Sequence, residues 1–99
     1  MKSIVGTPLY MSPQILKRTK YTSKSDLWSI GLIYYEMLHG KTPWPASNEL
    51  QLINGIYSRK PMFSKEVSDL SKDFIMKCLE INEDDRIGWD QAFEHKLIQ

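Results

Sequence analysis

The chain has 99 residues, of which 41% are hydrophobic and 25% charged, a balance typical of a folded domain rather than of intrinsic disorder. The formal net charge of +1 excludes an electrostatic case for binding nucleic acid or an anionic membrane. Cys78 is the single cysteine, so no internal disulfide can form, and we expect a cytoplasmic protein. The longest apolar-rich stretch, from Leu27 to Leu38, is too short to span a bilayer.

The first half of the chain predicts two helices. Ser12 and Pro13 have the order of an N-cap and a first helical residue, opening a short turn that ends near residue 16. The run 23–26 has the spacing of a capping box and precedes a helix over about 26–38. Apolar residues occupy nearly every face of that helix, so we expect it to be buried all round. Gly40 is placed to end it.

The second half predicts three more helices. Ser47 is the expected cap of a helix that reaches about Tyr57, Ser68 starts the next, and Trp89 starts the last. Their predicted apolar stripes are Leu50, Ile53 and Tyr57, then Leu70, Phe74, Ile75, Cys78 and Leu79, then Ala92, Phe93 and Leu97. No segment alternates as a strand does. We therefore expect one all-α unit over residues 1–99, with about five helices joined by loops.

Four motifs follow one another in a fixed order. They are Gly6-Thr7-Pro8-x-Tyr10-Met11-Ser12-Pro13-Gln14, Asp26-x-Trp28-Ser29-x-Gly31, Gly40-Lys41-Thr42-Pro43-Trp44, and Arg86 after an acidic turn. Together these motifs resemble the C-terminal lobe of the eukaryotic protein kinase catalytic domain, from the end of the activation segment onward. The resemblance covers essentially the whole chain. It divides the chain into a substrate-positioning segment (3–16), a buried central helix (26–38) and the remaining helices (47–99).

The resemblance implies a protein serine/threonine kinase, which transfers a phosphoryl group from ATP with Mg²⁺. These 99 residues contain no Gly-rich phosphate loop, no strand lysine, no His-Arg-Asp loop and no Asp-Phe-Gly motif. The chain alone is therefore predicted to be inactive and to hold neither cofactor nor catalytic residue. His39 and His95 are isolated and lack the spacing of metal ligands, so no metal site is expected.

The first motif implies a role in binding a protein or peptide substrate. In the family, Gly6, Thr7 and Pro8 correspond to the segment that receives the residue after the phosphoacceptor. The Thr7 hydroxyl can both donate and accept a hydrogen bond, which suits contact with a catalytic aspartate and lysine. The plain alternative is a loop threonine bonded to nearby backbone. Ser3 matches a position that is often phosphorylated in related kinases, and its alternative is an ordinary terminal serine.

Four further residues match positions that hold the kinase fold together. Asp26 resembles the carboxylate that accepts N–H bonds from the catalytic loop, although it also suits a simple helix cap. Trp28 is expected to be a core anchor, as are Trp44 and Trp89. Arg86 matches a buried arginine that normally pairs with a glutamate. Gln14 stands where the family has that glutamate, so the ion pair is replaced by a neutral amide contact.

Glu36 lies where some kinases bind a basic side chain of the substrate, although a plain structural carboxylate fits the same position. Two functions compete with the kinase interpretation. A pseudokinase-like or remnant helical module could bind proteins without catalysis, with helix 47–57 as a docking surface. A truncated product without independent function is the other. Because the central helix needs cover on every side, we also expect the chain to expose a contiguous apolar patch.

Overall fold

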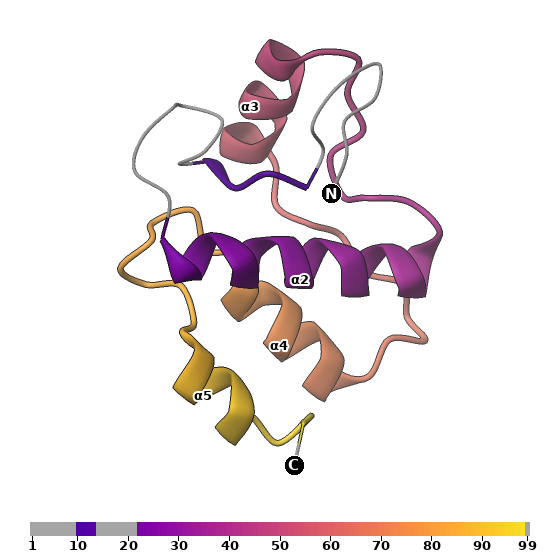
Figure 1. The fold of residues 1–99 in the computed structure, drawn as a ribbon. Helices are drawn as coiled ribbons and strands as arrows, with labels where there is room; N and C mark the ends of the chain where they lie inside the picture. The colour runs from indigo at the N-terminus through magenta and orange to yellow at the C-terminus, as the bar shows by residue number, and fades with distance from the viewer. Residues whose placement is uncertain (1–9, 14–21, 99) are drawn as a thin grey trace.

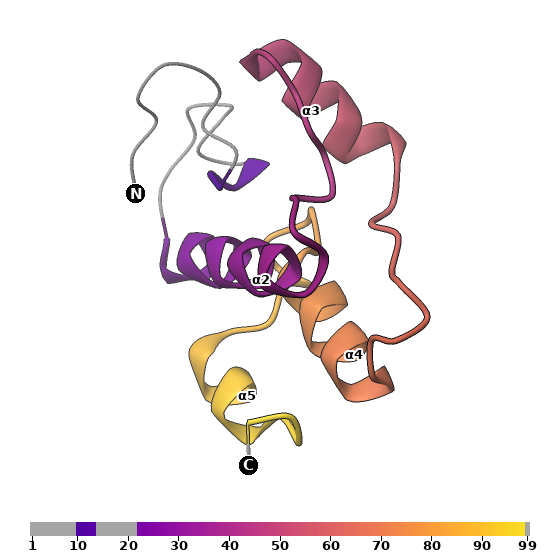
Figure 2. The same cartoon turned by 90° about the vertical axis from the view of Figure 1, so that its right-hand side faces the viewer.

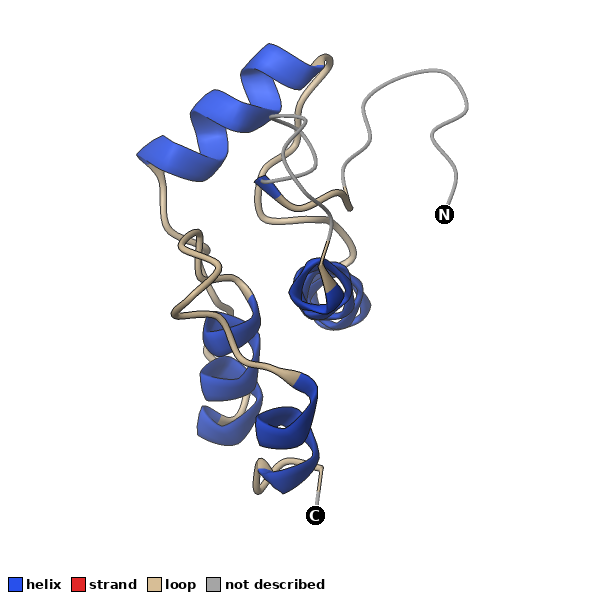
Figure 3. Cartoon of the chain, turned by 60° about the vertical axis from the view of Figure 1, so that its left-hand side comes forward, coloured by secondary structure: helices blue, strands red, loops and turns tan. Residues whose placement is uncertain are grey.

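The computed structural model describes residues 10–13 and 22–98 of the chain. It contains the helices α2 (Ser23–His39), α3 (Glu49–Ser58), α4 (Asp69–Cys78) and α5 (Trp89–Glu94), and the described residues form no strand (Figure 3). The prediction of an all-α fold is confirmed. Of the short helix expected near residue 13, Pro13 is helical and the rest lies outside the described residues. No helix in the described part is long and apolar enough to cross a membrane.

Helix α2 forms the centre of the arrangement. It has α3 on one side and α4 with α5 on the other (Figure 1). The view from the side shows the same order, with α3 well separated from the α4–α5 pair (Figure 2). Among the helices, α2 packs mainly against α4 and touches α5 over a shorter length. Helix α2 is therefore the central element, against which the others pack.

The start of α2 differs from the prediction. Thr22, in extended conformation, is the N-cap, and its Oγ1 accepts the Lys24 N–H at 3.3 Å. The expected cap at Ser23 is wrong, because Ser23 is already the first helical residue. The end agrees with the prediction: Gly40 adopts the left-handed conformation (φ 78°) and donates its N–H to the Glu36 carbonyl at 2.7 Å.

Two buried clusters make up the core. The larger cluster joins α2, the turn after it, α3 and α4, and its members are Trp28, Leu32, Tyr35, Trp44, Leu52, Ile56, Ile75 and Leu79. The smaller cluster joins α2, α4 and α5, and its members are Leu27, Phe74, Cys78, Ile87 and Ala92. Since α2 contributes to both clusters, each side of the fold depends on it. Burial of such side chains is the main favourable term in folding.

Helix α3 turns a different face to the core than predicted. Its cap is Asn48, whose side chain accepts the Gln51 N–H at 2.8 Å, so the expected cap at Ser47 is wrong. The buried residues are Leu52 and Ile56, whereas the predicted Leu50 and Tyr57 are 68% and 48% exposed. Leu50 with Tyr57 and Leu52 with Ile56 both have helical spacing. The second pair is the buried one because it packs in the core cluster that contains Trp44.

Single residues of α4 and α5 also differ in burial from the prediction. Ser68 caps α4 as predicted, and Phe74 and Cys78 are buried, but Leu70 is 46% exposed. Helix α5 has only six residues and reaches the core through Ala92. Phe93 is exposed, and Trp89 is 38% exposed, so the prediction that Trp89 is a core anchor is wrong. The two rings instead lie beside each other, with their centroids 6.0 Å apart.

One face of α2 is uncovered in the described structure. Ile33, Met37 and Leu38 are 49%, 76% and 42% exposed. The expectation that the helix is buried all round is therefore wrong for the described residues. The expected apolar patch is present on this face, where Ile33 and Met37 also line a hollow with Tyr34 and residues of α4 and the C-terminal end.

Candidate functional site

The described part of the first motif lies along α2. The Ser29 hydroxyl donates to the Tyr10 carbonyl at 2.6 Å, and the Ser12 hydroxyl donates to that of Ser25 at 3.3 Å. Because the later residue of the motif meets the earlier residue of the helix, the segment runs antiparallel to α2. Ser12 and Pro13 are buried. The segment is thus fixed in position by hydroxyls one helical turn apart.

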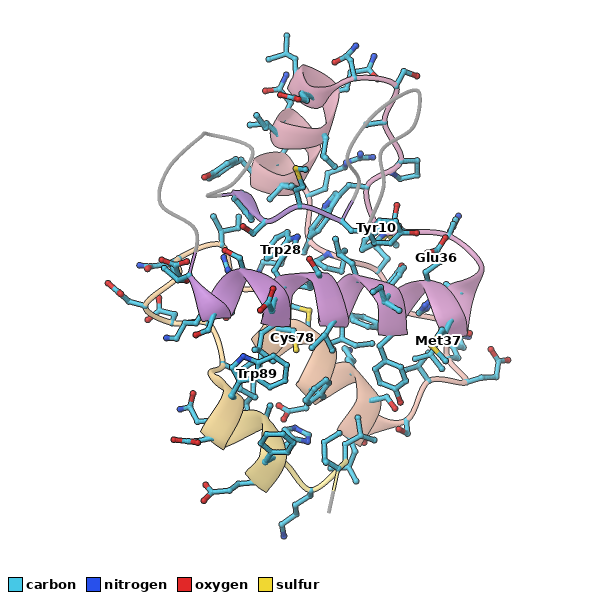
Figure 4. The ribbon with its side chains drawn as sticks, in the orientation of Figure 1. Tyr10, Trp28, Glu36, Met37, Cys78 and Trp89 are labelled. Carbon is cyan, nitrogen blue, oxygen red and sulfur yellow. The ribbon has the colours of Figure 1, made fainter. Side chains whose placement is uncertain are left out.

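Tyr10 and Glu36 form the polar pair of this site. The phenol of Tyr10 donates a hydrogen bond to Glu36 Oε1, and both side chains are partly buried. Figure 4 shows the two residues on the same side of α2. The bond to Glu36 raises the pKa of Tyr10, and burial and the negative charge of Glu36 act in the same direction. The phenol therefore remains a donor at neutral pH, and Glu36 Oε2 has no partner among the described residues.

Arg86 joins the start of α2 to the segment after α4. Its side chain is 1% exposed and donates from Nε to the Glu80 carbonyl at 2.9 Å. Nη1 donates to the Lys24 carbonyl at 3.0 Å, and Nη2 donates to that of Ile81 at 3.2 Å. The guanidinium also lies 5.1 Å from the ring centroid of Trp28. Burial lowers the pKa of Arg86, although an arginine stays charged at any physiological pH.

The third motif packs on the second through two indoles. Trp28 is fully buried and stacks on Trp44, with ring centroids 5.6 Å apart and planes 10° from parallel. The indole N–H of Trp44 donates to the Arg59 carbonyl at 2.9 Å. The turn after α2 is thereby held between α2 and the end of α3.

Of the remaining predicted site residues, the structure describes only Asp26. Asp26 is partly buried in the first turn of α2, where the helix dipole favours a carboxylate. Ser3, the three residues 6–8 and Gln14 lie outside the described residues, so their predicted roles stay predictions. Within the described part, no group of three or more His, Cys, Asp or Glu side chains could hold a metal.

Sequence reasoning missed the residues that hold the segment in place. Tyr10 and Ser29 stand inside the recognised motifs, yet only their neighbours received a role. The available signal was the pair Ser25 and Ser29, two hydroxyls four residues apart and therefore on one face of the helix. The Tyr10–Glu36 bond joins residues 26 positions apart, and no local pattern predicts such a pair.

This site and fold define a helical unit with a short segment fixed along its central helix. A family model described as "Protein kinase domain" matches residues 1–98. The chain belongs to the protein kinase family.

Several relatives are similar to nearly all of the chain. A serine/threonine-protein kinase atg1 of Dictyostelium discoideum is 40% identical over 94% of the chain and 14% of its own length. A serine/threonine-protein kinase apg-1 of Neurospora crassa is 39% identical over 98% of the chain and 10% of its own length. A serine/threonine-protein kinase H1 homolog of Danio rerio is 39% identical over 99% of the chain and 24% of its own length. The chain thus spans a quarter or less of each of these relatives.

Proposed function

We propose that this part of a serine/threonine kinase domain positions the protein substrate during phosphorylation. The observation that carries the proposal is the fixed course of residues 10–12 along α2, held by Ser25, Ser29 and Glu36. Phosphoryl transfer requires little covalent help from the protein and depends on positioning and electrostatic stabilisation. A segment held by buried hydroxyl bonds supplies rigid positioning. Residues 6–8 come shortly before it in the sequence, and in this proposal they contact the peptide.

Glu36 has a second part in the proposal, as the acceptor of a basic substrate side chain. Its Oε1 accepts the Tyr10 phenol, and its Oε2 has no partner among the described residues. A carboxylate held in one orientation by a neighbouring donor is suited to a bond with an arginine or lysine. Tyr10 would then act as the positioning residue for Glu36.

The experiment compares Tyr10→Phe and Glu36→Gln with the unaltered full-length kinase. We expect either change to raise KM for a peptide carrying an arginine near the phosphoacceptor, by about tenfold for a lost charged hydrogen bond. KM for ATP should stay unchanged. A matched peptide with alanine in place of the arginine should show no such change. Equal effects on both peptides would contradict the role of Glu36, and a changed KM for ATP alone would contradict substrate positioning.

The family implies ATP and Mg²⁺ for the complete enzyme. The described residues do not fit either group, because they contain no cluster able to hold a metal and the chain has none of the nucleotide-binding motifs. We therefore assign no step of the phosphoryl transfer to a residue of this part of the domain. Its contribution in the proposal is to hold the protein that is phosphorylated.

A second candidate function is protein docking on α3. Leu50 and Tyr57 are 68% and 48% exposed, and both lie on the side of α3 that faces away from Leu52 and Ile56. Exposed apolar side chains on one helix face are typical of a partner surface. Leu50→Glu should weaken binding of a protein substrate while phosphorylation of a short peptide continues unchanged. If both substrates are affected equally, the α3 docking proposal fails.

A further inference from the structure

A basic hollow lies beside the C-terminal end of α2, away from the Tyr10–Glu36 pair. It has a volume of about 730 Å³ and is formed by the end of α2, the turn that follows it and the segment after α3. Its rim carries the exposed cations Lys41, Arg59 and Lys60, and no carboxylate lines it. None of the three cations forms an ion pair with a described residue. The hollow therefore carries three cations that have no ion-pair partner among the described residues.

The floor of this hollow is made of three rings. Tyr35 and His39 stack with their centroids 4.0 Å apart. Phe63 meets both rings edge-on, with centroids 5.5 Å from Tyr35 and 5.8 Å from His39. Such a floor offers apolar contact to a ligand whose charged groups reach the rim.

Hydrogen bonds fix the floor before any ligand arrives. The Tyr35 phenol donates to the Met62 carbonyl, which joins α2 to the segment after α3. The His39 ring bridges the same two segments: Nδ1 lies 3.0 Å from the Tyr35 carbonyl, and Nε2 accepts the Ser64 N–H at 3.1 Å. This pattern requires the neutral ring with its proton on Nδ1. A site held in this way loses little freedom on binding.

Glu66 and Glu80 belong to neighbouring segments, and neither lines the hollow. Glu66 accepts a hydrogen bond from the Ser64 hydroxyl, and this bond lowers the pKa of Glu66. Glu80 lines a neighbouring hollow, which shares Arg59 and Lys60 with this one.

We propose that this hollow binds an acidic peptide segment of a partner protein, with glutamate or aspartate on the rim cations and an apolar side chain on the floor. Three cations around one concavity suit a short peptide. A nucleic acid or a membrane would need an extended basic face, and the whole chain has a net charge of only +1. The proposal does not depend on kinase activity, because none of these residues belongs to the substrate-positioning site.

The test uses the full-length protein and two short fluorescein-labelled peptides. One alternates glutamate with leucine, and the other has glutamine in place of each glutamate. Fluorescence anisotropy should show saturable binding of the acidic peptide, weakened by salt, and no binding of the glutamine peptide. Lys41→Glu and Lys60→Glu should each weaken binding by about tenfold, because each replaces attraction by repulsion at the rim.

Lys96→Glu is the matched control, since it makes the same charge change at an exposed lysine outside the hollow. It should leave the affinity unchanged. In ¹⁵N spectra, the indole signal of Trp44, whose N–H bonds to the Arg59 carbonyl, should shift on peptide addition, whereas that of Trp89 should not. Lys60→Gln, which keeps the same chain length, provides a milder variant if the reversal alters the fold.

Three results would overturn the proposal. The first is no saturable binding of the acidic peptide. The second is an equal loss of affinity in Lys96→Glu and Lys60→Glu, which would show general attraction rather than a site. The third is tighter binding of single-stranded DNA or of phosphatidylserine vesicles that is lost in the same rim variants, which would assign the hollow to a different class of partner.

Discussion

Gly31 of α2 lies directly against Cys78 of α4. A Cβ atom placed on Gly31 would stand 2.5 Å from the Cβ of Cys78 and 3.3 Å from a methyl group of Leu79. Real Cβ atoms do not approach each other so closely, so the two helices meet where only a glycine fits. The contact joins the two core clusters, because Cys78 belongs to one and Leu79 to the other.

Gly31→Ala should destabilise the full-length protein despite the better helix propensity of alanine. Forcing an extra methyl into a packed core costs about 1–3 kcal/mol, which outweighs the gain of about 1 kcal/mol from replacing glycine in a helix. Urea unfolding measures the difference. The paired variant Gly31→Ala/Cys78→Gly removes the Cys78 side chain, whose Cβ is the nearest neighbour of the new methyl. If the two changes are simply additive, the helices do not meet at this point.

The thiol of Cys78 should be inert in the folded protein. It is fully buried, and burial raises its pKa to about 12, while the charge of Arg86 acts in the opposite direction. Thiols react as thiolates, so a disulfide reagent at about pH 8 should label Cys78 only after unfolding. The rate of labelling in native buffer and in urea measures this. Fast labelling in native buffer would mean that α2 and α4 separate readily.

Arg86→Lys should lower the stability considerably although the charge is kept. Lysine has no fork to reach the carbonyls of Lys24, Glu80 and Ile81 together, and a compact ammonium does not lie over the Trp28 ring as a guanidinium does. Loss of bonds from a charged donor at a buried site should cost about 2–4 kcal/mol. Thermal unfolding of the two proteins measures the cost. A change within experimental error would show that the three carbonyls are satisfied without Arg86.

Helix existence and order could be predicted from the sequence, whereas the face each helix turns inward could not. On α3 the spacing allowed either Leu50 with Tyr57 or Leu52 with Ile56, and Trp44, a contact from outside the helix, makes the second pair the buried one. The N-caps of α2 and α3 each lie one residue from the predicted position, at Thr22 instead of Ser23 and at Asn48 instead of Ser47. In both places a neighbouring side chain of similar chemistry offered an equivalent signal.

The candidate site, too, could be predicted from the sequence only in part. The motifs identified the segment and the helix that meet, because both are contiguous in the sequence. The bond between Tyr10 and Glu36 depends on how the segment lies along α2, and nothing in either motif fixes that course. The basic hollow likewise gathers Lys41, Arg59 and Lys60 from two loops that come together only in the folded chain.

The pair Asp73 and His95 links α4 to the C-terminal end and should make stability depend on pH. His95 is largely buried, and its Nε2 lies 2.7 Å from Asp73 Oδ2, while Nδ1 accepts the Leu97 N–H at 3.0 Å. Lys77 Nζ lies 3.0 Å from the same carboxylate oxygen. The hydrogen bond to His95, and then that to Lys77, lowers the pKa of Asp73.

A carboxyl group whose pKa is lower in the folded than in the unfolded state contributes stability above its unfolded pKa of about 3.9. That contribution is lost as pH falls through the lower, folded pKa. Asp73→Asn should therefore reduce the free energy of unfolding at neutral pH, by under about 1 kcal/mol because the Asp73 side chain is half exposed. Urea unfolding over a pH series should show this difference shrinking toward zero in acid.

Asp85→Asn is the control, because it changes an exposed aspartate that lines the same hollow as His95 and forms no ion pair with a described residue. It should show no such trend. A difference between wild type and Asp73→Asn that stays constant down to the acid limit of the folded state would mean that the charge of Asp73 does not hold the C-terminal end in place.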